Sequence, residues 1–343
     1  MKHNWEYKQL GDICDKGSSN LMQKNLEIID NGFEVFGASG SLGKIDFYQQ
    51  EAPYVGIVKD GSGVGRCNLY PAKSSLLGTM QYIIAKNCVS NEYLCYLMQS
   101  LNLSKYVNGA AIPHIYFRDY KKEIVPVPPM EVQERIVAEL DKINETIEDC
   151  RELLRNLDAL AQSLFYDFFG DPVINPKGWT LKPWSDCINI INGKNQKAVE
   201  NPNGQFPIYG SGGIMSYADA YLCPEYCTII GRKGNISKPI FVKTKFWNVD
   251  TAFGLCPDKS ILAPLYLYFF CKNYDFEKHN KAVTIPSLVK GDLLKIQIPV
   301  PPLELQEKFA ERIEQIDAQK KAVEETIANL QTLLDSRMDY WFN

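Results

Sequence analysis

The chain lacks the features that mark membrane, secreted and metal-binding proteins. No apolar run approaches the roughly 20 residues that a membrane-spanning helix needs. The N-terminal stretch MKHNWEYKQL has no apolar core of the kind that signal peptides carry. The ten cysteines form no C-x-x-C pair, and histidine occurs only at positions 3, 114 and 279. We therefore expect a cytoplasmic protein with no membrane partner and no metal site, whose cysteines are scattered buried thiols in a reducing compartment.

Familiar catalytic motifs are also absent. There is no NPPY-type methyltransferase tetrapeptide, only INPKG and ENPNG, which lack the paired proline and aromatic residue that stack a flipped base. No H-x-x-x-H, D-x-D-G or G-x-S-x-G motif occurs, and three histidines leave little for acid–base chemistry. Carboxylates are plentiful, so composition alone does not exclude an enzyme. No catalytic set can be named, however, so the residues alone neither identify an enzyme nor exclude one.

What the chain does contain is an internal repeat. At an offset of 173 residues, VFGASG (35–40) aligns with IYGSGG (208–213), and YLCYL (93–97) aligns with YLYFF (266–270). Further along, VPVPPMEVQERI (125–136) aligns with IPVPPLELQEKF (298–309). The matches spread over the whole unit, and 343 residues suffice for two domains with sizeable cores. We infer a tandem duplication.

The first part of each unit predicts a mixed α/β globule. Short apolar runs such as PYVGIVKDG and YCTIIGRKG, punctuated by Gly and Pro, are typical of strands and turns. One helical stretch interrupts them, around Tyr93–Gln99 in the first copy and Leu265–Cys271 in the second. The fold class is therefore α+β, with two globules related by the repeat.

The second part of each unit predicts a long helix. Pro128 and Pro129 cannot continue a strand and fit just before a helix, where Glu131 and Glu134 favour the positive end of the helix dipole. Apolar residues then recur in steps of four and three, as a heptad seam requires. In the first copy they are Ile136, Leu140, Ile143, Ile147, Cys150, Leu154, Leu157, Ala161, Leu164 and Phe168; in the second they are Phe309, Ile313, Ile316, Val323, Ile327, Leu330 and Leu334, with Lys320 as a polar break.

Each of these helices should be about 40 residues, or roughly 60 Å long. Its apolar stripe needs a partner of equal length, which the other copy provides. We expect the two helices to pair as an antiparallel coiled coil with pseudo-twofold repeat symmetry. Pairing with another chain is the alternative.

Charge is divided between the globules and the helices. The helices carry ten acidic and four basic residues (130–170) and nine acidic and five basic residues (303–343), whereas the net charge is +1 over residues 1–129 and +5 over 171–302. Neutral to basic globules on acidic helices suit a protein whose globules touch a polyanion. Charged faces that only contact solvent would give the same counts.

The candidate binding residues lie in polar, glycine-rich segments of the globules. The loops at 36–46 and 209–219 could cradle a phosphate or form plain tight turns, and they lack the P-loop and dinucleotide-binding fingerprints. VKDGSGVGR (58–66) and GRKGNISKP (231–239) combine cations with Gly and Ser or Asn, which suits phosphate or guanine contacts as well as a solvated hairpin tip. The candidates are Ser39, Lys44, Lys59, Arg66 and His114 in the first copy, and Ser211, Arg232, Lys233, Lys238 and Ser287 in the second.

Two globules, each followed by a long heptad helix that begins at PVPPxxxQ, resemble the specificity subunit of type I restriction–modification systems over the full chain. The resemblance implies that each globule is a target recognition domain for one half of a bipartite site in double-stranded DNA. It implies domains at 1–128 and 171–301 and spacer helices at 129–170 and 302–343. By position, the domain-to-helix junctions would be Pro126, Pro128, Pro129 and Gln133, and Pro299, Pro301, Pro302 and Gln306.

The same resemblance implies the partners. Two methylation subunits that bind S-adenosylmethionine would dock on the helices, and restriction subunits that use ATP and magnesium would complete the complex. The resemblance further implies that this chain is a non-catalytic subunit, so no cofactor is expected in it.

Two other classes of function are compatible with the residues themselves. Tandem globules on a coiled-coil stalk could form a protein-interaction scaffold without DNA binding. A glycine-loop nucleotide site would instead make the chain an enzyme. Salt-dependent duplex binding separates the first from a DNA reader, and nucleotide binding by the isolated chain tests the second.

Overall fold

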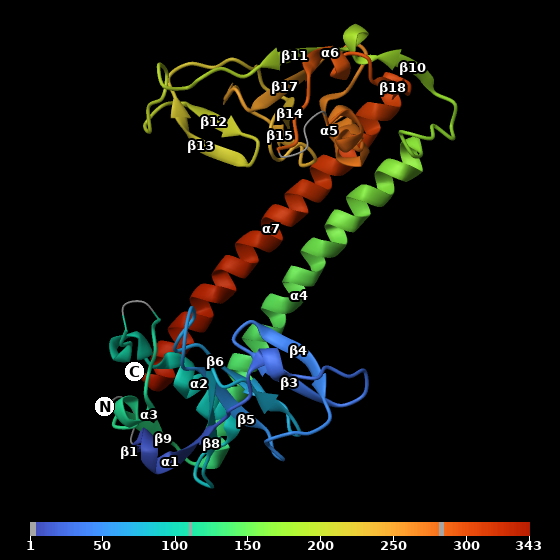
Figure 1. Cartoon of the computed structure of the whole chain (residues 1–343). Coiled ribbons are helices and arrows are strands. Elements are labelled where there is room, and N and C mark those ends of the chain that lie inside the picture. The colour runs from blue at the N-terminus through green and yellow to red at the C-terminus, as the bar shows by residue number, and fades with distance from the viewer. Residues whose placement is uncertain (1–4, 110–111, 281–284) are drawn as a thin grey trace. The chain divides into compact units, whose positions relative to one another are not determined.

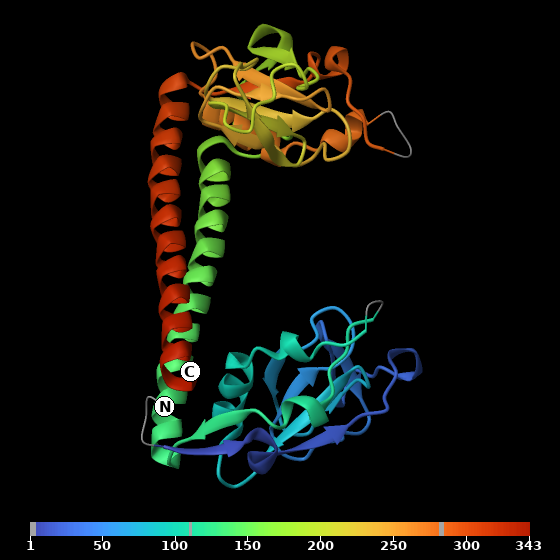
Figure 2. The same cartoon turned by 90° about the vertical axis from the view of Figure 1, so that its left-hand side faces the viewer.

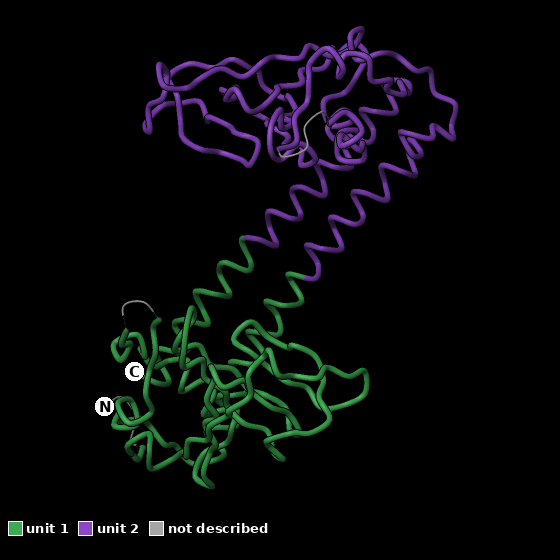
Figure 3. The backbone as a smooth tube through the Cα atoms, in the orientation of Figure 1, with its two compact units in different colours: residues 1–151, 325–343 green, residues 152–324 purple. Residues whose placement is uncertain are grey.

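The computed structural model describes residues 5–109, 112–280 and 285–343. The chain divides into two compact units, residues 1–151 with 325–343 and residues 152–324 (Figure 3). Each unit holds one globule together with one end of each of two long helices. We name them unit 1 and unit 2. The predicted pair of mixed α/β globules, each followed by a long helix, is confirmed.

The described residues of unit 1 form three small sheets (Figure 1). The largest is antiparallel, with its strands in the order β2 (Cys14–Ser18), β8 (Met80–Ala85), β5 (Tyr54–Val58) and β6 (Cys67–Tyr70). Next to it are the sheet of β4 (Gly40–Ile45), β3 (Phe33–Gly37) and β7 (Ser75–Leu76), and the pair of β1 (Glu6–Gln9) with β9 (Ile124–Val127). Helices complete it: α1 (Leu10–Ile13), α2 (Asn91–Ser100), α3 (Phe117–Tyr120) and the 3-10 turns η1 (Gln23–Asn25) and η2 (Leu103–Tyr106).

Unit 2 repeats the strand plan of unit 1. Its four-stranded sheet has the order β11 (Ile188–Asn192), β17 (Ala252–Pro257), β14 (Cys227–Gly231) and β15 (Ile240–Val242). Its smaller sheets are β13 (Gly213–Ala218), β12 (Phe206–Gly210) and β16 (Trp247–Asn248), and β10 (Thr180–Pro183) with β18 (Gln297–Val300). The helices are α5 (Pro264–Asn273), α6 (Lys290–Leu293), η3 (Trp184–Asp186) and η4 (Phe276–His279). The predicted helical stretches at 93–99 and 265–271 are thus α2 and α5.

The long helices α4 (Met130–Phe169) and α7 (Leu303–Phe342) are 40 residues each. In unit 2, Phe165 near the end of α4 packs against Phe309 near the start of α7, with ring centroids 5.8 Å apart. In unit 1, the start of α4 meets the end of α7, where Glu139 pairs with Arg337 (Figure 2). The two helix segments within each unit therefore run antiparallel. None of the described helices combines the length and apolar character needed to cross a bilayer.

Most seam residues lie where the heptad pattern places them. Those buried are Ile136, Leu140, Ile143, Ile147, Leu157, Ala161, Phe309, Ile313 and Ile316; those half-buried are Cys150, Leu154, Val323, Ile327, Leu330 and Leu334. The end of α4 differs from the prediction. There Phe165 and Phe169 are buried, while Leu164 and Phe168 are only half-buried. The reason is that this end packs on the aromatic core of unit 2 as well as on α7, so the buried stripe widens beyond the heptad positions.

In each unit an equivalent aromatic contact joins the end of a long helix to the globule. Phe169 at the end of α4 packs edge-on against Tyr266 of α5, with centroids 4.8 Å apart. Phe342 at the end of α7 packs against Tyr93 of α2, at 5.4 Å. These residues are equivalent in the repeat, so each globule is covered by the end of the helix that follows the other globule. Burying such large rings on both elements stabilises each helix end on its globule.

The expectation that every cysteine is a free thiol is wrong for one pair. Cys227 on β14 and Cys256 on β17 form a disulfide, and the other eight cysteines are free. The partners are 29 residues apart in sequence but neighbours across the ladder, because Thr228 pairs with Leu255. Sequence spacing draws attention to Cys223 and Cys227 instead. Strand register, which the sequence does not display, selects the true partner.

Candidate nucleic-acid interface

In unit 1 two loops that are distant in sequence are joined backbone to backbone. The Gly61 amide donates to the Pro113 carbonyl at 2.8 Å, and the Ile115 amide donates to the Lys59 carbonyl at 3.0 Å. Between these bonds, Asp60 and His114 form an isolated antiparallel bridge. The candidates Lys59 and His114 are therefore brought together.

In unit 2 the same ladder forms from the equivalent residues. The Gly234 amide donates to the Pro286 carbonyl at 2.9 Å, and the Leu288 amide donates to the Arg232 carbonyl at 2.9 Å. Lys233 and Ser287 form the bridge. We call the two arrangements the paired loops, residues 59–61 with 112–116 in unit 1 and residues 232–234 with 285–289 in unit 2.

A left-handed glycine shapes each pair of loops. Gly61 has φ +88° and Gly234 has φ +79°, a conformation that disfavours residues with a Cβ. In each unit, two successive backbone amides of the loop also donate hydrogen bonds to a single carbonyl of a neighbouring segment. The amides of Lys59 and Asp60 donate to Thr79, and those of Arg232 and Lys233 donate to Thr251. The backbone frame is thus fixed, while the side chains at the bridge are free to differ.

The cations of these segments are held in different ways. Lys59 lies 3.8 Å from the carboxylate of Asp60. Arg232 donates to the Asp250 carbonyl at 3.4 Å and lies over the Phe253 ring. Lys233 is exposed at the bridge of unit 2. The paired loops of unit 2 therefore present more positive charge than those of unit 1.

Arg66 connects a second hairpin to the site in unit 1. Its guanidinium donates to the carbonyl of Ala38 at 3.2 Å, next to the exposed Ser39 at the β3–β4 turn. Ser211 occupies the corresponding β12–β13 turn and is half-buried. Lys44 lies within β4 opposite Glu34, and Lys238 is exposed in the segment before β15. No contact of a described residue ties Lys44 or Lys238 to the paired loops.

Two further residues of unit 1 extend the paired loops beyond the sequence candidates. The His114 ring meets the Tyr116 ring edge-on with centroids 4.8 Å apart, and the Arg118 guanidinium lies 4.5 Å from the centre of the Tyr116 ring. Tyr116 and Arg118 were not sequence candidates, because those came from the glycine-rich segments and from the residues directly after Pro113 and Pro286. Val289 and Gly291 are the equivalents of Tyr116 and Arg118 in the second copy. An aromatic residue beside a cation was the available signal.

The PVPPxxxQ junction is built around a buried glutamine. Gln133 is fully buried; its oxygen accepts from the Ser90 amide at 3.0 Å, and its nitrogen donates to the Cys88 and Pro128 carbonyls, each at 2.9 Å. Gln306 makes the equivalent bonds to the Ala263 amide and to the Ile261 and Pro301 carbonyls, at 2.8, 3.1 and 2.8 Å. Each glutamine thus ties the start of a long helix to the start of α2 or α5.

The prolines of the junction position the same elements. Pro126 and Pro299 lie in the edge strands β9 and β18, and the double prolines, Pro128 with Pro129 and Pro301 with Pro302, directly precede α4 and α7. Tyr93 donates to the Pro126 carbonyl at 3.0 Å, and Tyr266 donates to the Pro299 carbonyl at 2.6 Å. The repeated sequence therefore corresponds to a repeated set of polar contacts.

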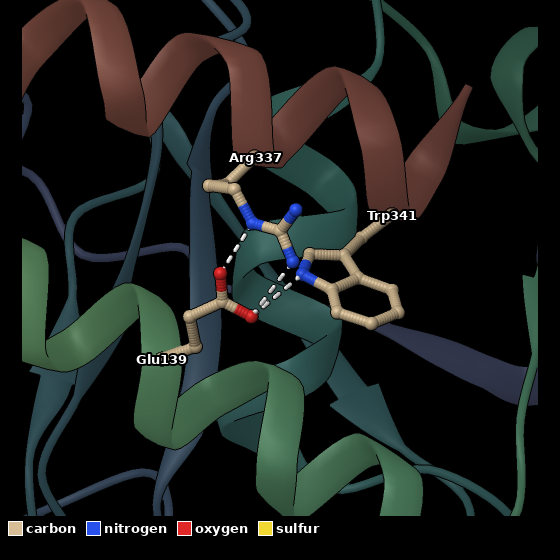
Figure 4. A network of polar contacts seen from close by, with 3 residues as sticks. All are labelled: Glu139, Arg337 and Trp341. Atoms are coloured by element: carbon tan, nitrogen blue, oxygen red, sulfur yellow. Dashed lines mark hydrogen bonds and ion pairs between the residues drawn. The ribbon is translucent and has the colours of Figure 1, made fainter.

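Figure 4 shows a polar network in unit 1 that has no copy among the described residues of unit 2. Arg337 forms a forked pair with the carboxylate of Glu139, and the indole nitrogen of Trp341 donates to the same carboxylate at 3.1 Å. The hydrogen bond from Arg337 holds the pKa of Glu139 below its ordinary value. In unit 2, Lys320 instead pairs with Asp158 at 2.6 Å, which explains how a lysine sits in the seam.

Potential metal ligands and thiol nucleophiles are limited among the described residues. None of them forms a cluster of three or more His, Cys, Asp or Glu side chains that could hold a metal ion. Burial raises the pKa of the Cys187 thiol to about 11 and that of Cys14 to about 12, so neither is a ready nucleophile. The paired loops can present positive charge, donate hydrogen bonds and, at Asp60, accept them.

Comparison with known proteins agrees with the repeat. The family model of the type I restriction modification DNA specificity domain matches twice, at residues 2–157 and 176–331. The type I restriction enzyme MjaIX specificity subunit of Methanocaldococcus jannaschii is 26% identical over 66% of this chain and 62% of its own length. A putative type I restriction enzyme specificity subunit of Haemophilus influenzae is 20% identical over 98% of this chain and 94% of its own.

Solved structures share the fold. The S subunit of a type I restriction–modification system from M. genitalium superposes with a TM-score of 0.67 at 16% identity, covering 99% of this chain and 96% of its own. A chain from a study of assembly and conformational transition of the type I R-M system gives 0.59 at 20% identity, covering 98% and 96%. The two matches to the family model span most of the sequence. The chain therefore belongs to the type I restriction modification DNA specificity domain family and carries that domain twice.

Proposed function

We propose that this chain is the DNA-specificity subunit of a type I restriction–modification complex, in which each globule recognises one half of a bipartite target. The observation that carries the proposal is the pair of equivalent loop ladders with different side chains at the bridge. Asp60 and His114 stand in unit 1 where Lys233 and Ser287 stand in unit 2. One backbone frame with two sets of polar side chains suits two different half-sites, because base edges are distinguished by their donors and acceptors.

The proposed division of labour follows the repeat. Residues 1–128 and 171–301 recognise DNA, while residues 129–170 and 302–343 set the spacing between the half-sites and dock two methylation subunits. The heptad seam and the acidic outer faces of the helices support the second assignment, since an acidic surface repels DNA and suits a protein partner. S-adenosylmethionine would bind to the methylation subunits, and ATP and magnesium to restriction subunits, so this chain supplies selectivity and no chemistry.

The first test is to map the modified bases in cells that express the chain with its methylation subunits. A bipartite motif with a fixed spacer is the expected result. A continuous motif, or no motif, would contradict the proposal. Binding of the purified complex to duplex DNA should also fall steeply as salt rises. Negligible duplex binding at all salt concentrations would favour a protein-interaction scaffold instead.

The second test assigns the halves. Replacing residues 171–301 by the corresponding globule of a related subunit should change one half of the motif and leave the other half intact. A motif in which both halves change, or neither changes, would contradict the assignment. The matched control is the reciprocal exchange of residues 1–128, which should alter only the opposite half.

The third test concerns the helices as a spacer. Inserting seven residues into α4 after Arg151, and seven into α7 after Glu324, preserves the heptad and adds about 10.5 Å to each helix. The spacer between half-sites should lengthen by about three base pairs, since successive base pairs are about 3.4 Å apart. A matched insertion of five residues breaks the heptad and should abolish specific modification. An unchanged spacer after the seven-residue insertions would overturn the role of the helices.

A further inference from the structure

Each of the paired loops exposes an isoleucine at the same place. Ile112 is 66% exposed and Ile285 is 60% exposed, and the two residues are equivalent in the repeat. Four residues later, Tyr116 is 43% exposed and Val289 is 47% exposed. Between them, Ile115 and Leu288 are buried, so residues 112–117 and 285–290 share one pattern of burial. The loops thus present apolar side chains to solvent in register.

A single exposed isoleucine on a protein surface needs no explanation. The recurrence is different, because the surrounding polar positions have diverged. The bridge residues are Asp60 and His114 in one unit and Lys233 and Ser287 in the other, yet the isoleucine is the same. An exposed apolar side chain adds nothing to the stability of the fold, so folding does not explain why both copies keep it. Its retention beside two different polar sets points to a contact that both units make.

The backbone holds each isoleucine in a defined position. The residue that follows is Pro113 or Pro286, which restricts the isoleucine to an extended conformation. The carbonyl of that proline accepts the amide of Gly61 or Gly234, so the isoleucine stands directly beside the bridge. A β-branched side chain on such a frame has few rotamers to lose on binding.

The surroundings select the partner. In unit 2 the exposed cation Lys233 forms the bridge with Ser287, which lies two residues after Ile285. In unit 1, Arg118 stacks on the exposed Tyr116 four residues from Ile112. An apolar tip with cations beside it matches duplex DNA, where an aliphatic side chain can contact a thymine methyl or enter between base pairs while cations meet the phosphates.

We propose that Ile112 and Ile285 are DNA-contacting residues, each of which packs its side chain against the bases of the half-site that its own globule recognises. This inference rests on the proposed function and deepens it. The isoleucine supplies an apolar contact common to both halves, and the differing bridge residues supply the discrimination between them. An apolar wedge of this kind binds best at a base step that unstacks easily.

The experiment measures binding by the complex of the full chain with its methylation subunits. The probes are a duplex that carries the mapped motif and a scrambled duplex of the same length. We expect I112A and I285A each to weaken binding to the motif duplex about tenfold, as loss of a base contact does, with little effect on the scrambled duplex. The dependence on salt should not change, because no charge is removed.

Two exposed isoleucines outside the paired loops serve as controls. Ile124 in unit 1 is 59% exposed and Ile174 in unit 2 is 75% exposed, so I124A and I174A make the same substitution at exposed sites elsewhere. Both should bind the motif duplex like the wild type. Thermal unfolding of all four variants checks that none loses its fold. A 2-aminopurine placed in turn at each step of a half-site should brighten at one step with the wild type and not with the matching variant.

The outcomes separate the inference from the function on which it rests. If the wild type does not distinguish the motif duplex from the scrambled one, the proposed function fails. If the wild type distinguishes them and I112A and I285A bind as tightly as the controls, the isoleucine contact is refuted. If the variants lose their methylation subunits instead of affinity for DNA, these loops are protein-docking sites and the proposal is overturned. Weaker binding without a 2-aminopurine signal supports packing on a base edge rather than between base pairs.

Discussion

The two units share one fold but differ in the side chains that their loops and hairpins expose. The hairpins β3–β4 and β12–β13 have the same register, including the same shift after Val35 and after Ile208. The junction glutamines make the same three hydrogen bonds, and each long helix ends on an equivalent aromatic pair. Contacts that hold the frame were kept after duplication. This shows which parts of the sequence specify the fold rather than the ligand.

The differences gather at exposed positions of the same frame. In β4 the side chains of Ser41 and Lys44 stand where β13 has Ile214 and Tyr217, so one hairpin is polar and the other has exposed apolar residues. A shared frame tolerates such changes because solvent-facing positions contribute little to packing.

The largest expected effect tests the equality of the frames. Q133L and Q306L each leave a buried amide and two buried carbonyls without partners, so each should lower the free energy of unfolding by about 3 kcal/mol. Urea unfolding followed by tryptophan fluorescence measures both. The two losses should agree closely, since the bonds are the same. A loss below about 1 kcal/mol at either site would show that the junction is not equivalent in the two units.

The control for this pair is Q315L on the exposed face of α7. Gln315 is exposed and accepts a long hydrogen bond from Arg312 at 3.3 Å, so its replacement should change the free energy of unfolding by less than about 0.5 kcal/mol. The comparison isolates burial of the amide from the change of residue type.

A smaller effect, on DNA binding, tests the difference between the loops. K233D gives unit 2 the charge that Asp60 gives unit 1, and we expect about tenfold weaker binding to the motif duplex near 0.1 M salt. D60K makes the opposite change and should strengthen binding to the scrambled duplex. The slope of log affinity against log salt should change by about one for each, in opposite directions.

The matched control is K142D, which makes the same charge change on an exposed lysine of α4. It should leave both the affinity and the salt slope within about twofold of the wild type, because screening weakens distant charges. If K142D weakened binding as much as K233D, net charge rather than the paired loops would govern the interaction.

The shared fold of the two units was predictable because it depends on the spacing of particular residues along the sequence. The double prolines, the heptad seam and the repeat at one offset identify two globules and two helices, and all follow from local rules. The buried stripe at Phe165 and Phe169 was not predictable in this way, because it depends on an aromatic core assembled from α5 and α7. The Cys227–Cys256 disulfide was not predictable either, because it depends on the register of β14 against β17.

The site was only partly predictable. Lys59, His114, Lys233 and Ser287 were candidates by composition, but their pairing across the bridges arises from the closing of two distant loops. Ile112 and Ile285 carry no polar group and resemble core residues in the sequence. Only their exposure distinguishes them from Ile115 and Leu288, which lie three residues further along and are buried.

The smallest expected effect concerns the Glu139–Arg337–Trp341 network, which among the described residues occurs in unit 1. Glu139 is partly exposed, so solvent screens its pair with Arg337, and E139Q should lower the free energy of unfolding at pH 7 by about 0.5–1 kcal/mol. Because the folded state lowers the pKa of Glu139, this stability is present above its ordinary value of 4.5 and is lost as pH falls through the folded pKa. Urea unfolding at pH 7 and below pH 4.5 should therefore show the wild type and E139Q converging on acidification. E145Q, at an exposed pair with Lys142, should show almost no difference at either pH. A gap between wild type and E139Q that persists in acid would mean that packing against Trp341, rather than charge, anchors the end of α7 on unit 1.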